Sequence, residues 1–165
     1  VADRLAELSA SRVFLLGGPG EEPLARVVEA NMRGKPVNLA GRLNVNELCY
    51  VIGNLDVLIT NDSGPMHIAA AVGTPVVALF GPGDPVMFGP YAPAGKAAVI
   101  TRNPPCRPCD LVSCNDLRCL LEIRPEEVVA ATMGLLTRGR SSRPGVQTNL
   151  DFRTRVATRP SSPRS

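Results

Sequence analysis

The chain alternates short apolar runs with longer segments whose apolar residues recur at helical spacing. The apolar runs predict five strands, at residues 13–16, 37–39, 56–60, 75–80 and 97–101. The segments between and after them predict helices at residues 21–32, 45–52, 64–72 and 125–136. In the first of these helices, one apolar face is expected from Leu24, Val27, Val28 and Met32. The alternation predicts an α/β fold, a parallel sheet with helices on both faces, in which ligands lie beyond the carboxyl ends of the strands.

A polar turn connects the strand at 56–60 to the helix that begins near Gly64. Asp62 or Ser63 is expected to cap this helix. The free N–H groups of its first turn and the positive end of its dipole favour a bound anion such as phosphate. His67, the single histidine of the chain, lies about one turn further along. Taken alone, Asp62 is better explained as a helix cap, and a lone histidine such as His67 is more often a structural residue than a ligand.

Two further loops are expected at the same edge of the sheet. The first, GGPGEE at residues 17–22, leaves the strand at 13–16 with glycines that let the backbone approach a ligand. The second, GPGDP at residues 81–85, follows the strand at 75–80 and is stiffened by prolines. Both loops have simpler explanations. Glu21 and Glu22 suit the start of a helix, and Gly-Pro turns are common in surface connections.

The sequence DSGPMHIAAAVGTP at residues 62–75, followed by LFGP at 79–82, resembles glycosyltransferase family 9, the bacterial heptosyltransferases. The pattern of that family is D-(S/T)-G-x-x-H-x-A-A-A-x-G-x-P and then (L/Y)-(F/Y)-G-P. The resemblance implies a GT-B enzyme with two Rossmann-like domains, of which this chain supplies the C-terminal, donor-binding one. It implies transfer of heptose from an ADP-sugar to the lipid A core at the cytoplasmic face of the inner membrane, with no cofactor and no nucleic acid.

The resemblance also implies a donor site built from two turns. It places Glu21 on the ribose hydroxyls, Asp62 on the donor sugar, and His67 on the phosphate or sugar. Ser63 and Gly64 present N–H groups and a hydroxyl to the diphosphate. The implied donor-binding residues are Gly18, Glu21, Asp62, Ser63, Gly64 and His67. It places no catalytic residue here, because the family's general base lies on the other domain and its assisting lysine precedes the first strand of this one. We therefore expect this chain to bind donor without turnover.

Four cysteines near the end of the chain have the spacing C-x2-C-x4-C-x4-C. They are Cys106, Cys109, Cys114 and Cys119. Four thiolates at such spacing suit tetrahedral zinc. However, the segments CRPC at 106–109 and RCL at 118–120 also resemble a cysteine-rich segment of the second-heptose enzymes of family 9, which is not implied to bind metal. A zinc site, disulfides and a structural cysteine-rich loop therefore all stay open, with disulfides disfavoured in a reducing cytoplasm.

Charge divides the chain into two parts. Residues 1–137 carry eleven Lys and Arg against fourteen Asp and Glu, and residues 138–165 carry seven Arg against Asp151. The basic part is rich in Ser, Thr, Pro and Arg and poor in large apolar residues. We therefore predict a donor-binding domain at 1–137 and a disordered tail at 138–165, or else an arm attracted to anionic lipid or nucleic acid.

Other functions are compatible with parts of the sequence. No apolar run approaches the ~20 residues of a spanning helix, and the first residues lack the zones of a signal peptide, so a soluble cytoplasmic protein and a truncated start are expected. The architecture would also suit another GT-B nucleotide-sugar enzyme or an epimerase. A further alternative is a non-catalytic binding module organised by a zinc-type cysteine cluster.

Overall fold

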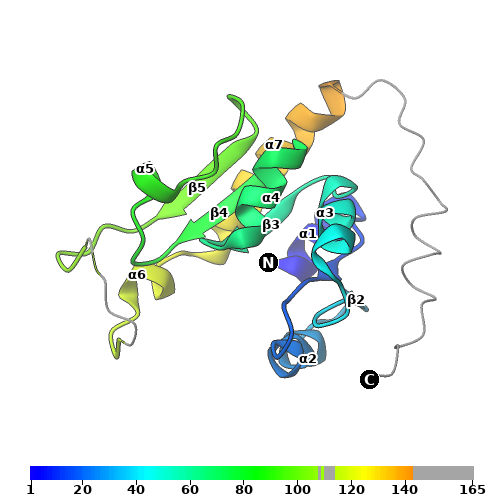
Figure 1. The fold of residues 1–165 in the computed structure, drawn as a ribbon, viewed down its shortest axis with the longest axis horizontal. Coiled ribbons are helices and arrows are strands. Elements are labelled where there is room, and N and C mark those ends of the chain that lie inside the picture. Colours follow the sequence, from blue (N-terminus) through cyan, green and yellow to red (C-terminus); the bar gives the residue numbers. More distant parts are fainter. Residues whose placement is uncertain (108, 110–113, 143–165) are drawn as a thin grey trace. The chain divides into compact units, whose positions relative to one another are not determined.

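The computed structural model describes residues 1–107, 109 and 114–142. These residues divide into two compact units, which we describe separately: the N-terminal unit, residues 2–44, and the C-terminal unit, residues 45–142 with Val1. Figure 1 labels the elements of both except β1. Each of the five predicted strands is present, and every strand pairing is parallel. The α/β prediction is therefore confirmed.

The N-terminal unit contains α1 (Ala2–Ser9), β1 (Phe14–Leu15), α2 (Glu22–Ala30) and β2 (Val37–Asn38). Its two strands pair with Phe14 opposite Val37. Leu24, Val27 and Val28, which we expect on one apolar face of α2, are all exposed, and the buried residue of the helix is Ala25. A sheet of two very short strands offers α2 little surface to cover, so only a small side chain is buried.

The C-terminal unit is built around a three-stranded sheet in the order β3-β4-β5. The strands are β3 (Leu58–Asn61), β4 (Val76–Phe80) and β5 (Ala97–Thr101). Its helices are α3 (Val45–Gly53), α4 (Gly64–Val72), α5 (Pro85–Phe88), α6 (Arg118–Leu121) and α7 (Pro125–Ser142). The central strand is the most deeply buried, with Val76, Val77, Ala78 and Phe80 all at 0% exposure. Such a continuous apolar run is typical of a parallel strand covered on both faces.

Helices cover the two faces of this sheet. Val77 packs with Val128 and Leu135 of α7, which forms the cluster on one face. Strand residues alternate between faces, so Val76, Ala78 and Phe80 point the other way. On that side α4 contacts β3 and β4 and buries Met66 and Ala69 completely. The sheet therefore has a fixed helix-covered centre, and its carboxyl-terminal edge is left for the loops.

The helix α4 ends where the sequence requires a glycine. Gly73 adopts φ = 77°, a left-handed conformation that residues with a Cβ rarely adopt, and its N–H bonds to the carbonyls of Ala69 and Ala70. The next residue, Thr74, is buried and donates its hydroxyl to the Ile52 carbonyl at 2.8 Å. This hydrogen bond joins the end of α4 to α3, which also contacts α4 directly.

The last helix is longer than expected, since α7 continues to Ser142 rather than ending at residue 136. No proline lies between residues 137 and 142, and the one glycine there, Gly139, costs a helix only about 1 kcal/mol. Residues 143–165 of the predicted basic tail lie outside the described residues. No helix in the described chain is both long and apolar enough to cross a membrane.

Candidate functional site

Three loops of the C-terminal unit leave the same edge of its sheet. The strand β3 ends at Asn61, β4 at Phe80 and β5 at Thr101, and the register places these ends side by side. Adjacent parallel strands present their carboxyl ends together, where ligands of α/β sheets bind. The turn before α4, the loop at residues 81–84 (the Gly83 loop) and the segment after β5 therefore surround one region.

The start of α4 is the first part of this region. Ser63 is the N-cap, with φ = −163° and ψ = 169°, but its side chain makes no capping bond. Its hydroxyl instead donates to the Asn61 carbonyl at 3.1 Å and lies 3.1 Å from the Thr60 hydroxyl oxygen. The Gly64 N–H has no partner within the described chain, and the space where a Cβ of Gly64 would stand is open. This helix start can therefore receive an anion.

The side chain of Asp62 lies beside the helix start but does not cap it. Its carboxylate lies against Gly83, where an added Cβ would collide with Oδ2. Its N–H donates to the Leu79 carbonyl at 3.2 Å, which fixes its backbone at the edge of the sheet. The prediction of a cap by the side chain of Asp62 or Ser63 is therefore wrong. Contacts with neighbouring residues hold both side chains elsewhere.

Two side chains form hydrogen bonds at the Gly83 loop, Asp84 from the loop itself and Arg107 from the segment after β5. Asp84 accepts a hydrogen bond from the Val86 N–H at 2.8 Å and so caps the short helix α5. Arg107 donates to the Gly83 carbonyl from one side of its guanidinium, and to Thr101 and Arg102 from the other. Sequence reasoning missed this role of Arg107. The signal available was its position inside the CRPC segment.

His67 is exposed on the surface of α4. Its imidazole forms no hydrogen bond or ion pair with any residue that the structure describes. Met66, its neighbour on the helix, is fully buried instead. The structural alternative for His67, a histidine satisfied inside the core, is not supported by this exposure. Its predicted contact with a ligand stays a prediction.

The turn that contains Gly18 and Glu21 belongs to the N-terminal unit and is closed by its own residues. The Gly18 N–H donates to Oε2 of Glu21 at 2.5 Å, and the Glu21 N–H donates to the Gly18 carbonyl at 3.2 Å. Glu21 is also the N-cap of α2, without a side-chain capping bond. One carboxylate oxygen is thus used to shape the turn. The predicted meeting of this turn with Asp62 and His67 stays a prediction.

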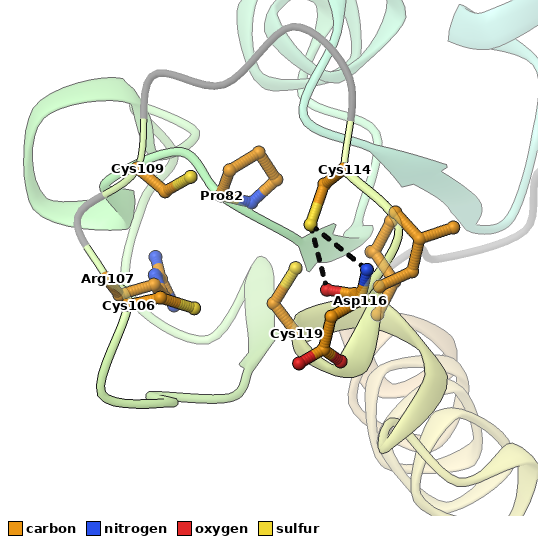
Figure 2. Close-up of a pocket in the computed structure, with 9 residues that line it drawn as sticks. Pro82, Cys106, Arg107, Cys109, Cys114, Asp116 and Cys119 are labelled. Atoms are coloured by element: carbon orange, nitrogen blue, oxygen red, sulfur yellow. Dashed lines mark hydrogen bonds between the residues drawn. The ribbon is translucent and has the colours of Figure 1, made fainter.

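The four cysteines line one cavity of about 150 Å³ next to the Gly83 loop, as Figure 2 shows. The other lining residues are Pro82, Arg107, Asp116, Leu117 and Leu120. The thiol of Cys114 donates to the Asp116 carbonyl at 3.1 Å, and the Asp116 N–H points at the same sulfur at 3.3 Å. Among the described residues no three Cys, His, Asp or Glu side chains are placed to share a metal ion. The arrangement therefore lends no support to the zinc alternative.

Asp116, which lines this cavity, forms an ion pair with Arg118. The Arg118 side chain bonds to the Asp116 carboxylate at 2.6 Å, and this hydrogen bond holds the pKa of Asp116 below its ordinary value. Both side chains are about half exposed. An exposed pair of this kind contributes little to stability, so the packing around the cavity depends on other contacts.

Similar proteins were found by sequence and by structure. Residues 1–116 match the family model of glycosyltransferase family 9 (heptosyltransferase). The lipooligosaccharide heptosyltransferase 2 of Haemophilus influenzae is 39% identical over 104 residues, which cover 59% of this chain and 30% of that protein. The protein of the same name from a Campylobacter jejuni strain is 31% identical over 138 residues, which cover 78% of this chain and 43% of that protein.

Two solved structures share the fold. The family 9 glycosyl transferase from Veillonella parvula superposes with a TM-score of 0.70 at 30% identity, covering 83% of this chain and 39% of that one. The E. coli ADP-heptose lps heptosyltransferase II gives a TM-score of 0.70 at 27% identity, covering 84% and 41%. The chain thus spans less than half the length of these relatives. Because the family model covers more than half of its residues, the chain belongs to glycosyltransferase family 9.

Proposed function

We propose that this chain is the donor-binding domain of a heptosyltransferase that transfers heptose from an ADP-sugar to the lipopolysaccharide inner core. The observation that carries the proposal is the start of α4. There the Gly64 N–H, which has no partner among the described residues, lies at the carboxyl end of β3, two residues after Asp62. Membership in family 9 supports sugar transfer as the reaction class. The similarity to the E. coli ADP-heptose lps heptosyltransferase II supports an ADP-linked heptose as donor.

The proposed binding mode follows the chemistry of each group. The diphosphate lies at the N–H groups of Ser63 and Gly64, where the helix dipole and the free donors both favour negative charge. His67, exposed about one turn further along α4, donates to the phosphate or the sugar. Asp62, held against Gly83, accepts hydroxyl hydrogen bonds from the sugar. In the N-terminal unit, Gly18 and Glu21 bind the ribose through the backbone and the carboxylate.

This mode gives the helix start a role in the reaction. When the bond between the anomeric carbon and the donor oxygen breaks, negative charge builds up on the departing ADP. Fixed N–H dipoles stabilise that charge more in the transition state than in the ground state, which is the condition for raising the rate. We assign the general base that takes the acceptor proton to no residue of this chain. The acceptor, the lipid A core, is proposed to bind to the other domain of the enzyme.

We further propose that the enzyme works at the cytoplasmic face of the inner membrane. The lipid acceptor is the reason for this location, since its sugars extend from the bilayer surface while a nucleotide-sugar donor is dissolved in the cytoplasm. Peripheral contact with the membrane is part of this proposal. Neither a cofactor nor a nucleic acid is required by it.

Calorimetric titration of the 165-residue chain with ADP and with UDP tests the proposal. We expect ADP to bind at least about tenfold more tightly than UDP, a difference of ~1.4 kcal/mol. Val72→Ala, at the far end of α4 from the site, is the control and should leave both affinities unchanged. Equal binding of UDP, or no ADP binding by protein that unfolds cooperatively, would overturn the donor assignment.

A further inference from the structure

Arg107 connects two of the three loops at the proposed donor site. Its Nη2 donates to the Gly83 carbonyl, and its Nη1 donates to the Arg102 carbonyl at 2.6 Å and to the Thr101 hydroxyl. The first acceptor lies after β4 and the other two lie at the end of β5. We propose that Arg107 is a positioning residue of the donor site. It holds the Gly83 loop against Asp62 and thereby fixes the Asp62 carboxylate for the donor sugar.

The guanidinium suits this task because of its shape. Its N–H donors form a rigid planar fork, so one side chain can bond in fixed directions to acceptors on two loops. A lysine ammonium is a flexible point charge without that fork. The backbone of Arg107 is fixed as well, because its backbone N–H donates to the carbonyl of the buried Pro104 at 3.0 Å. Arg107 is therefore anchored at both its backbone and its tip.

The second step leads from Gly83 to Asp62. The Cα of Gly83 lies so close to the Asp62 carboxylate that an added Cβ would collide with Oδ2. This loop is thus one wall of the space that the carboxylate occupies. The Asp62 backbone is fixed separately by its bond to the Leu79 carbonyl. Loss of Arg107 should therefore release the loop and the carboxylate, while the backbone of the α4 turn keeps its place.

This separation predicts an unequal effect on two ligands. The proposed diphosphate site is made by the backbone of Ser63 and Gly64, to which Arg107 makes no described hydrogen bond. The proposed sugar contact is made by the Asp62 carboxylate, whose wall Arg107 holds. Loss of a residue that only stabilised the fold would weaken the binding of both ligands by similar factors. The inference rests on the proposed function, since it assigns sugar recognition to Asp62.

The test measures ADP-heptose and ADP affinity for the 165-residue chain, its Arg107→Lys and Arg107→Ala variants, and Arg118→Ala as control. Arg118, like Arg107, lies between Cys106 and Cys119. It pairs with Asp116 and makes no described bond to the Gly83 loop. Both Arg107 variants should weaken the affinity for ADP-heptose by roughly tenfold and the affinity for ADP by less than about threefold. The tenfold change corresponds to the loss of one charge-assisted hydrogen bond. The control should change neither.

Other outcomes separate the two proposals. If the unchanged chain binds ADP-heptose but Arg107→Lys leaves the ratio of the two affinities unaltered, the positioning role is wrong and the donor site stands. If the chain without substitutions binds neither ligand, the proposed donor-binding function is wrong, and the positioning role that rests on it is wrong with it. Should Arg107→Ala not fold, Thr101→Val removes a single acceptor of Arg107. It should then reproduce the selective loss of ADP-heptose in milder form, and equal loss of both ligands would contradict the inference.

Discussion

Replacement of His67 by alanine should weaken donor binding and leave the fold intact. The imidazole is exposed and bonds to none of the described residues, so no packing or hydrogen bond of the described chain is lost with it. Surface changes of this kind alter the free energy of unfolding by no more than about 0.5 kcal/mol. Alanine is also a better helix former than histidine, and this difference opposes any small loss of stability.

The expected loss of affinity is larger. One hydrogen bond to a charged phosphate contributes about 1.5–3 kcal/mol. That range corresponds to roughly a 10- to 150-fold weaker ADP affinity. Calorimetric titration measures the affinity, and thermal unfolding of the same sample measures stability, with Val72→Ala on the same helix as control. A large fall in melting temperature with unchanged ADP affinity would instead make His67 a structural residue and exclude it from the donor site.

Three other changes should act through contacts that the structure describes. Asp62→Ala should weaken ADP-heptose binding and shift the free energy of unfolding by less than about 0.5 kcal/mol, because no capping bond is lost. A loss of stability near ~1 kcal/mol would instead show that the Asp62 side chain caps α4. Gly73→Ala, at φ = 77°, should cost about 1–2 kcal/mol in urea unfolding, whereas Gly34→Ala, which stands in open space without positive φ, should cost far less. The Arg102 hydrogen bond, and then the Arg124 N–H, hold the pKa of Glu127 below its ordinary 4.5. The stability that this carboxylate contributes is therefore present above pH 4.5 and is lost as the pH falls through the lowered pKa. Glu127→Gln should then make the free energy of unfolding depend less on pH in the acid range. An unchanged pH dependence in that range would contradict this prediction.

Local sequence was enough to predict the elements whose ends have clear signals. The strand at 97–101 has the predicted bounds, since Gly95 and Lys96 precede it and Asn103 and Pro104 end the apolar run. The helix α4 also begins at Gly64 as predicted and ends before Gly73. The one-turn helices α5 and α6 were not predicted. Four residues are too few to show a helical period, and α5 depends on the Asp84 cap.

The site was predictable in part, for a similar reason. The strand, turn and helix around Asp62 are local, so their order could be derived from the sequence. The orientation of the Asp62 carboxylate depends on Gly83, which lies 21 residues later in the chain. The bonds of Arg107 likewise join residues that only the fold brings together, among them Gly83, 24 positions away. No periodicity or capping rule reports contacts of this kind, so these features required the structure.

A crystal of this chain soaked with ADP shows directly whether the start of α4 binds the donor diphosphate. We expect diphosphate density beside the N–H groups of Ser63 and Gly64, with the His67 imidazole turned towards a phosphate oxygen. Density for the diphosphate at any other place on the chain would contradict the assignment of α4 as the donor site.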